Sequence, residues 1–501
     1  MGIIQRQALL NTIINYVGVA IGFVNVIVLF PLFLSQEEFG LTRLILSLAS
    51  TIANLSSFGI SRISVKFFPV FRTQPHKNNG LLTILFSLSA IGFSIVTLLY
   101  FSLKTPILEH YKGDNVLFSD YYIWVPLTAL GLLLFLVFES FLQALQKTVF
   151  TNFLRTIVLR AYWLVALLFY YFEFYSFFNF MIIYMLGYFF TAGLCIVQLI
   201  KHQELSFDVN PEYRKKRILK PLINYGAYTL LSSITLSLVQ NIDILMIGAM
   251  LPEKKLENVG IYAIATYIIT IIYIPKNALS RISSPIIAND WKRRRLDKIE
   301  TLYKKSSTIL VFLGGIIFGC IFLNIDSILQ FLKPEYAAAK YVIIILGLSR
   351  LLDMLFSFNY LILVVTKFYR SESILAIFLL ILVAVTNYIF IPIYGINGAA
   401  LATAAVFLSF NLILYFYIWN KLNMQPFTWN TFLMILFGSI ALITVYYLPI
   451  SIKNHYALIF IKSSFFCTLY FIPVYFFKVS EDINGMVDKY LVKLKVKNNK
   501  G

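Results

Sequence analysis

Long apolar stretches recur along the whole sequence, and they restrict the chain to one class of fold. Hydrophobic residues make up 59% of the 501 residues, and charged residues only 13%. A soluble protein of this length could not keep so much apolar surface away from water. A membrane-spanning helix needs about 20 mostly apolar residues, and runs of this length predict an integral membrane protein.

Fourteen such runs are long enough to cross a bilayer. They lie at 8–34, 41–67, 80–103, 120–145, 152–172, 176–200, 221–250, 258–287, 306–331, 337–365, 372–392, 396–420, 428–449 and 455–477. The first run follows Arg6 as a signal peptide would, but it is too long and has no small-residue cleavage site after it. We therefore predict an all-α integral membrane protein with about fourteen transmembrane helices.

Positive charge is distributed unevenly between the loops. If the N-terminus is cytoplasmic, the predicted cytoplasmic segments carry 29 Lys and Arg residues and the opposite segments carry 8. The positive-inside rule then predicts an even number of helices and two cytoplasmic termini. Basic cytoplasmic loops near anionic lipid headgroups also explain the net charge of +19. We predict no nucleic-acid partner, even for the basic run 292–295.

A weak internal repeat surrounds the basic segment 201–220. Gly40 and Gly260 lie within similar hydropathy and differ by 220 positions, and the SRIS tetrapeptides at 61–64 and 280–283 differ by 219. Two matching features that are separated by nearly the same number of residues indicate a duplicated unit. Such duplication is common in secondary transporters. The predicted parts are an N-lobe of six helices, a basic cytoplasmic linker, a C-lobe of six helices, a helix pair and a basic cytoplasmic tail, at 1–200, 201–220, 221–421, 422–477 and 478–501.

Eight of the charged residues in the predicted spans are candidates for a role inside the membrane. They are Arg62, Glu139, Arg160, Asp243, Lys276, Arg281, Arg350 and Asp353. Charges in the membrane are costly and usually line an interior cavity, so these residues are the functional candidates. Five are positive and three are negative. Because a guanidinium fork fits phosphate oxygens, this excess favours an anionic, phosphorylated cargo.

Several of these charges have a second interpretation. Arg350 and Asp353 are spaced to neutralise each other on one helix face, and Glu139 has Arg160 as a candidate partner. Arg62 and Arg281 lie towards the cytoplasmic ends of their runs, where long side chains can reach water. Both alternatives stay open beside a role in binding cargo.

Small and polar residues form a stripe in two of the predicted helices. The first stripe comprises Asn11, Asn15, Gly18, Gly22 and Asn25, and the second comprises Gly226, Thr229, Ser233, Ser237, Gln240 and Asp243. Such stripes allow close packing of helices. The alternative is that both line a hydrated cavity between two lobes.

The sequence lacks the usual signs of an enzyme or an ATP-driven pump. It contains no phosphate-binding loop of the G-x-x-x-x-G-K-[ST] type and no nucleophile–base constellation. Cys195, Cys320 and Cys467 lie in apolar runs at spacings that fit no disulfide or metal pattern, and the four histidines are scattered. We predict no catalytic residues, no metal and no cofactor. The short outer loops also argue against a glycan polymerase or ligase.

Short motifs resemble the multidrug/oligosaccharidyl-lipid/polysaccharide exporter superfamily, and within it the Wzx-type polysaccharide or O-antigen flippases. The motifs are Phe39-Gly40, Asn241-Ile242-Asp243 with Gly248, Val259-Gly260-Ile261-Tyr262, and Tyr394-Gly395-Ile396-Asn397-Gly398-Ala399-Ala400. The resemblance covers nearly the whole chain. It implies two six-helix repeats in a V-shaped arrangement like that of the MATE exporters, with an additional C-terminal helix pair.

The resemblance also implies a function. Such a protein moves an undecaprenyl-pyrophosphate-linked oligosaccharide from the inner to the outer leaflet of the bacterial cytoplasmic membrane by alternating access. We expect Arg62 and Arg281 to capture the pyrophosphate, with Arg160 and Lys276 as further binding charges. Asp243 and Glu139 are the candidates for coupling or gating, while Asn11, Asn15, Asn25 and Gln240 are the candidates for lining the cavity.

The expected partners are the lipid-linked substrate, membrane lipids and polysaccharide polymerase or assembly proteins. A lipid II flippase remains an alternative, because its cargo also carries pyrophosphate. A cation-coupled small-molecule exporter fits less well, because residues 1–34 contain no Asp or Glu.

Overall fold

The computed structural model describes residues 3–73, 78–111, 117–207, 210–366, 370–450, 452, 454–485 and 487–488. Within these ranges the chain forms helices and connecting loops and no β-strand, which confirms the predicted all-α class. The chain divides into two compact units. Unit 1 is Met1–Ile264 with Leu375–Ala399, and unit 2 is Ala265–Ile374 with Ala400–Gly501. The lobes deduced from the sequence repeat therefore differ from this division and stay a prediction.

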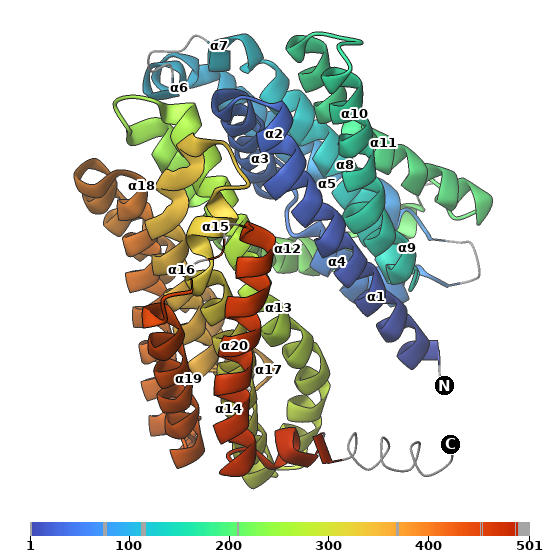
Figure 1. Cartoon of the computed structure of the whole chain (residues 1–501). Helices are drawn as coiled ribbons and strands as arrows, with labels where there is room; N and C mark the ends of the chain where they lie inside the picture. The colour runs from blue at the N-terminus through green and yellow to red at the C-terminus, as the bar shows by residue number, and fades with distance from the viewer. Residues whose placement is uncertain are drawn as a thin grey trace, which may run out of the picture. The chain divides into compact units, whose positions relative to one another are not determined.

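Unit 1 is built around α8, which is more extensively buried than any other spanning helix of the described chain. Helices α3, α4 and α11 pack against it, and Figure 1 shows α8 among its neighbours. The elements are α1 (Ile3–Phe23), π-helix η1 (Val24–Leu29), α2 (Phe30–Phe33), α3 (Gln36–Ser56), α4 (Ile60–Phe71), α5 (Leu81–Ser102), α6 (Lys104–Tyr111), α7 (Leu117–Tyr121), α8 (Trp124–Ala144), α9 (Thr148–Phe153), π-helix η2 (Leu154–Val158), α10 (Leu159–Tyr171), α11 (Phe177–Lys201), 3-10 helix η3 (Pro211–Arg214) and α12 (Lys216–Met250).

Local sequence explains how α3 begins and ends. Ser35 and Glu38 form a reciprocal capping box, in which each side chain accepts a hydrogen bond from the other residue's backbone N–H. The helix stops before Phe58 and Gly59, which both have positive φ. Gly59 suits this conformation because it has no Cβ, and α4 starts directly after it.

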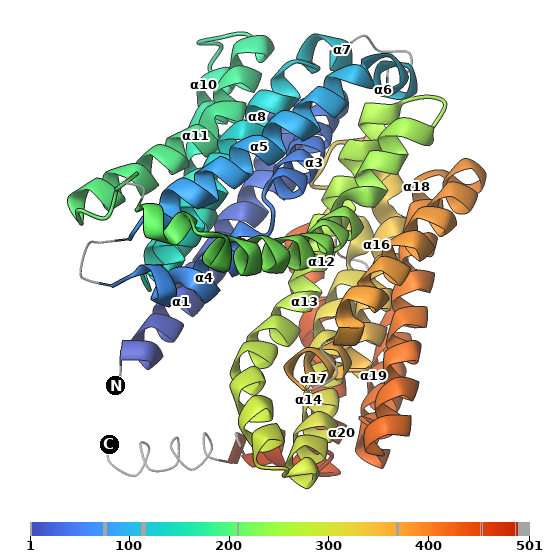
Figure 2. The same ribbon diagram turned by 180° about the vertical axis from the view of Figure 1, so that it is seen from behind.

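Unit 2 contains helix α14 with α16, α19 and α20 packed against it. Its remaining complete elements are α15 (Ile325–Leu329), 3-10 helix η4 (Pro334–Ala338) and α17 (Asn359–Val365), and the packed helices are α14 (Leu296–Leu323), α16 (Ala339–Leu355), α19 (Trp429–Tyr447) and α20 (His455–Phe476). Figure 2 shows α14, α19 and α20 near one another. The predicted C-terminal helix pair thus shares a hydrophobic core with α14, which includes Phe312, Met434 and Phe466.

Two long helices contribute residues to both units: α13 (Lys255–Lys292) and α18 (Arg370–Leu422). Helix α18 is interrupted at Gly395, where φ is 60° and ψ is −138°. A residue with a side chain rarely adopts this conformation, so the glycine accounts for the position of the break.

The predicted count of fourteen spanning helices is not confirmed. By length and composition, 11 helices in the described residues could cross a membrane, or up to 12 if the bent pair Pro334–Leu355 and Asn359–Val365 forms one span. Two of the predicted runs, 372–392 and 396–420, lie on the two sides of the Gly395 break in α18, and the seventh run lies on α12.

The two glycines that mark the sequence repeat meet in unit 1, where α3 crosses the start of α13. A Cβ atom on Gly40 would lie 1.7 Å from the carbonyl oxygen of Leu256, and one on Gly260 would lie 2.8 Å from that of Gln36. The helix backbones are therefore in direct contact, and neither position has room for a side chain. Close approach through small residues is typical of helix crossings in membranes.

Candidate functional site

The most buried ion pair of unit 2, among the described residues, joins two of the charges expected from the sequence. Lys276 on α13 and Asp353 on α16 are 8% and 7% exposed. The Lys276 Nζ donates to Asp353 Oδ2 at 2.7 Å and to the Asp353 backbone carbonyl at 3.0 Å. A buried ammonium is costly unless an acceptor compensates it, and here the carboxylate does so.

A chain of polar side chains extends from this ion pair. Asn411 donates to Asp353 Oδ1 at 2.9 Å, and Asn359 donates to the Asn411 backbone carbonyl at 3.1 Å. The Tyr303 hydroxyl donates in turn to Asn359 Oδ1. These residues come from α14, α17 and α18, so the network connects three helices to the Lys276–Asp353 pair. A hydrogen-bonded buried network of this kind rigidifies its surroundings.

Arg350 does not neutralise Asp353, which was one interpretation of their spacing. Its guanidinium instead lies over two aromatic rings, 5.3 Å from the centroid of Tyr273 and 4.6 Å from that of Phe407. Asp353 points to Lys276 and Asn411. The sequence could not show this, because three-residue spacing places two side chains on one face without choosing between partners on other helices.

Asp243 is the centre of a smaller cluster in unit 1. The Tyr262 hydroxyl donates to its Oδ2 at 2.5 Å, and Asn387 Nδ2 donates to its Oδ1 at 2.8 Å. The three residues lie on α12, α13 and α18. Both donors are neutral side chains, and together they orient the carboxylate.

Glu139 pairs with Arg155 and not with Arg160, the partner considered from the sequence. Glu139 is 4% exposed on α8, and Arg155 Nη2 donates to its Oε2. Arg160 points elsewhere: its Nη1 donates to the backbone carbonyl of Gly18 on α1. Arg155 lies within the π-helical turn η2 and Arg160 lies just after it, and such a turn alters the helical register between them.

The polar stripe on α1 and η1 packs against the α9–α10 segment. Asn11 donates to Thr148 Oγ1 at 3.4 Å and accepts from Asn152 at 3.2 Å, and Asn25 donates to the Arg160 carbonyl at 2.9 Å. These contacts are typical of a helix-packing face. Asn15 is half-buried on α1, and Gln240 is exposed on α12. A role for these four residues in lining a cavity remains a prediction.

The two arginines expected to capture pyrophosphate both have exposed side chains. Arg62 lies near the start of α4 in unit 1, and Arg281 lies in the part of α13 that belongs to unit 2. Exposure is compatible with binding cargo and with reaching water at the membrane surface. Their shared role stays a prediction.

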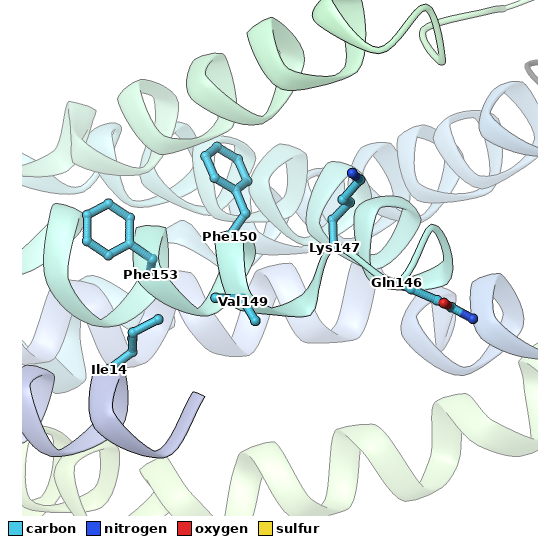
Figure 3. Close-up of a pocket in the computed structure, with 6 residues that line it drawn as sticks. All are labelled: Ile14, Gln146, Lys147, Val149, Phe150 and Phe153. Carbon is cyan, nitrogen blue, oxygen red and sulfur yellow. The ribbon is translucent and has the colours of Figure 1, made fainter. Parts of the chain in front are cut away.

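A pocket of about 410 Å³ lies in unit 1 beside α1 and α9 (Figure 3). It is lined mainly by apolar side chains, with Lys147 and Gln146 as its polar members. The lining residues are Ile14, Gln146, Lys147, Val149, Phe150 and Phe153. Lys147 precedes α9 in a predicted cytoplasmic segment and is the one charged side chain of the lining.

In the residues that the structure describes, no group of three or more His, Cys, Asp or Glu side chains could hold a metal ion. The three cysteines are free, and Cys195 is buried. Cys320 and Cys467 are half-buried, with their Sγ atoms 3.8 Å apart.

Sequence reasoning missed the neutral partners of the buried charges. Tyr262, Asn387 and Asn411 hold Asp243 and Asp353, yet each lies far from its partner in the sequence. The only sequence signal for Tyr262 was its place in the Val259-Gly260-Ile261-Tyr262 motif. For Asn387 and Asn411, an amide inside an apolar run was the only signal.

The matches to family models agree with this all-helical architecture. Residues 4–289 match a family described as polysaccharide biosynthesis protein, and residues 229–394 match the MatE family. The first match covers more than half of the chain, so the protein belongs to the polysaccharide biosynthesis protein family. It is a member of the multidrug/oligosaccharidyl-lipid/polysaccharide exporter superfamily. No curated protein matches the sequence.

Solved structures show the same fold at low sequence identity. The lipid II flippase MurJ in an inward closed conformation aligns with a TM-score of 0.75 and 15% identity, covering 94% of this chain and 99% of that chain. An inward-facing multidrug resistance MATE transporter aligns with a TM-score of 0.58 and 14% identity, over 84% and 95% of the two chains. A transporter from Pyrococcus furiosus, whose binding pocket is described as having reverse polarity, also gives 0.58 at 13% identity, over 83% and 95%. The chain is thus a multi-pass membrane protein with the fold of flippases and exporters.

Proposed function

We propose that the protein is a flippase for an undecaprenyl-pyrophosphate-linked oligosaccharide, such as a repeat unit of O-antigen, capsule or exopolysaccharide. The observation that carries the proposal is the match of residues 4–289 to the polysaccharide biosynthesis family, in a chain with the MurJ fold. The family match supports a glycan product, and the fold supports movement of a lipid-linked cargo across a membrane. The Wzx-type branch of the superfamily fits both.

The interior charges support an anionic cargo. Of the eight candidate charges in the predicted spans, five are positive, and Glu139 and Asp353 are each bonded to a cation. Arg62 and Arg281 are exposed and are our candidates for pyrophosphate capture. Lys276 donates to Asp353 and Arg160 donates to the Gly18 carbonyl, and both are expected to add positive potential.

Asp243 is the candidate for coupling or gating in this scheme. Its hydrogen bonds connect α12, α13 and α18 through neutral donors. A change in the charge of Asp243 would therefore alter the contacts between these three helices. Glu139 is a second candidate, although its bond to Arg155 favours a structural role. We place the protein in the bacterial inner membrane with both termini in the cytoplasm, where the basic loops would meet anionic lipid and polysaccharide assembly proteins.

A lipid II flippase is the second candidate, and the alignment with MurJ favours it. Both cargoes share a polyprenyl pyrophosphate, so the same arginines would serve either one. A cation-coupled small-molecule exporter is the third candidate, supported by the MatE match over residues 229–394. The positive interior suits a cationic drug poorly.

Liposomes that contain the protein and a fluorescent polyprenyl-pyrophosphate oligosaccharide test the proposal. An external glycosidase reports how fast glycan from the inner leaflet reaches the outside. We expect fast exposure with the wild type and at least about a tenfold loss in the double variant Arg62→Ala plus Arg281→Ala, because charge-assisted bonds to phosphate are worth about 1.5–3 kcal/mol. The matched control is Arg217→Ala plus Arg293→Ala, which removes two exposed arginines from predicted cytoplasmic segments.

The possible outcomes test the flippase function and the assignment of the two arginines separately. If both double variants act like wild type, the flippase stands and the arginine assignment fails. If wild-type liposomes match empty ones for this cargo and for lipid II, with and without an ion gradient, the exporter becomes the better explanation.

A further inference from the structure

Two of the three cysteines meet in unit 2, although their spacing in the sequence predicts no disulfide. Cys320 lies on α14 and Cys467 lies on α20, 147 positions further along the chain, and their Sγ atoms are 3.8 Å apart. The sulfur–sulfur bond of a disulfide is about 2.05 Å long, so the two atoms need to approach by about 1.8 Å. Rotation of two short side chains can cover this distance. The pair is therefore close to the geometry of a disulfide.

Glycines on α14 bring the two helices close together at this point. A Cβ atom on Gly319 would lie 2.2 Å from the Phe466 ring, and one on Gly315 would lie 3.2 Å from the Tyr470 ring. Both rings are buried in the core that α14 shares with α20. Close approach through small residues is typical of membrane helices. Because one cysteine directly follows Gly319 and the other directly follows Phe466, this helix contact holds the two thiols side by side.

The third cysteine provides an internal comparison. Cys195 lies in unit 1, is 0% exposed and makes no sulfur–sulfur contact among the described residues. Cys320 and Cys467 are half-buried, so a small molecule can reach their thiols. Within the part of the chain that the structure describes, no third His, Cys, Asp or Glu joins this pair as a metal ligand. The pair therefore has the access and the partner thiol that a disulfide requires.

Polar groups lie beside Cys320 at the end of α14. Asn324 follows the last residue of this helix and is 2% exposed. Its Nδ2 donates to the Cys320 backbone carbonyl at 2.8 Å and to Ser463 Oγ on α20 at 3.0 Å. The Asn324 Oδ1 is buried and accepts no hydrogen bond from the described residues. Since a buried acceptor gains from a donor, this oxygen can accept from the O–H of a small oxidant such as a hydroperoxide.

We propose that Cys320 and Cys467 form a reversible disulfide when organic hydroperoxides are present in the membrane. One sulfur attacks the O–O bond of the hydroperoxide and becomes a sulfenic acid, and the alcohol leaves with the thiol proton. The second sulfur attacks the sulfenic sulfur, and the S–S bond forms as the oxygen leaves as water with the second thiol proton. Two thiols and one hydroperoxide thus give a disulfide, an alcohol and water, and two electrons pass from the sulfurs to the hydroperoxide. A thiol reductant reverses the oxidation by exchange.

The disulfide would restrain the C-terminal helix pair. Helices α19 and α20 pack on α14 through the apolar core described above, and the S–S bond would add a covalent connection between α14 and α20. Closing so long a loop restricts the unfolded chain and stabilises the folded one. It would also prevent α20 from moving away from α14 in the oxidised protein. This inference goes beyond the proposed function and does not depend on the identity of the cargo.

The test uses the full-length protein in nanodiscs of phosphatidylethanolamine and phosphatidylglycerol, with cumene hydroperoxide as the oxidant. After denaturation, N-ethylmaleimide labels the free thiols, and mass spectrometry of the digested protein identifies free and linked cysteines. We expect most molecules to contain a peptide pair that links Cys320 to Cys467, and dithiothreitol should separate the pair. The unfolding temperature of the oxidised protein should rise by about 5 °C or more and return after reduction.

Cys195→Ser is the matched control and should keep both the linked peptides and the temperature shift, whereas Cys320→Ser and Cys467→Ser should lose both. The assignment is overturned if Cys320 and Cys467 stay free in the oxidised wild type, if they oxidise further without a link, or if Cys195 takes the place of either. A linked pair that leaves the unfolding temperature unchanged would overturn the restraint of α20. The decisive measurement uses the wild type, so it does not require any variant to fold.

Discussion

Arg43 and Arg350 have similar local environments and different consequences. Each guanidinium lies over two aromatic rings within about 5 Å. The rings around Arg43 are fully buried and two of its nitrogens are sealed, whereas Arg350 and both of its rings are half-buried. The comparison teaches that the sign and depth of an interior charge do not identify a binding residue. The two arginines differ instead in how completely the protein seals them.

The other interior charges each form hydrogen bonds or an ion pair with an identified group. Lys276 and Glu139 are each bonded to an opposite charge, Arg160 to a backbone carbonyl, and Asp243 to two neutral donors. Substitutions at these positions should therefore affect folding in proportion to how completely water is excluded from both partners of the interaction.

The largest expected effect follows from breaking the pair in unit 2. Lys276→Met leaves the Asp353 carboxylate buried without a counter-charge, which should destabilise the fold by about 3–5 kcal/mol. Thermal unfolding in detergent measures this. The double variant Lys276→Met plus Asp353→Asn removes both charges and should recover most of the loss; a double variant as unstable as the single one would show that packing, not charge, is responsible.

A smaller effect is expected for the corresponding pair in unit 1. Arg155→Met removes the cation bonded to Glu139, but the Arg155 side chain is 48% exposed, so water already screens the pair. We expect a loss of about 1–2 kcal/mol in the same unfolding measurement, with Arg155→Lys as the control. A loss equal to that of Lys276→Met would contradict the proposed dependence on burial.

Arg43→Met should cost still less. It removes two cation–π contacts, worth about 0.5–1 kcal/mol each, but it also removes a sealed charge with two nitrogens that lack partners among the described residues. We expect a net change of about 1 kcal/mol or less, measured by denaturant unfolding against Arg350→Met. A loss above about 3 kcal/mol would show that Arg43 contributes more to folding than its two ring contacts account for.

The smallest effect on folding is expected for Asp243→Asn. The amide oxygen can still accept from Tyr262 or Asn387, so the unfolding free energy should change by about 1 kcal/mol or less. If Asp243 couples or gates transport, the translocation rate should nevertheless fall by at least about tenfold. A rate equal to that of wild type would end the coupling assignment, and Asn387→Asp would then be the next variant to measure.

The sequence could predict the helices but not their contacts. Each of the fourteen apolar runs falls on a helix, because crossing a bilayer imposes a length and composition that can be read directly. Two of these runs, 372–392 and 396–420, lie on the two sides of the Gly395 break in α18. The pairing of Glu139 with Arg155 could not be predicted either, because a π-helical turn alters the register between Arg155 and Arg160.

The crossing of α3 and α13 has a consequence for the origin of the chain. Position 40 meets the carbonyl of position 256, and position 260 meets that of position 36. Both pairs are related by the same offset of 220 residues, so the contact is reciprocal, as in the isologous interface of a two-fold symmetric homodimer. A half-length ancestor with one such glycine could form this crossing between two separate copies. Gene fusion would then have converted a dimer interface into an internal joint.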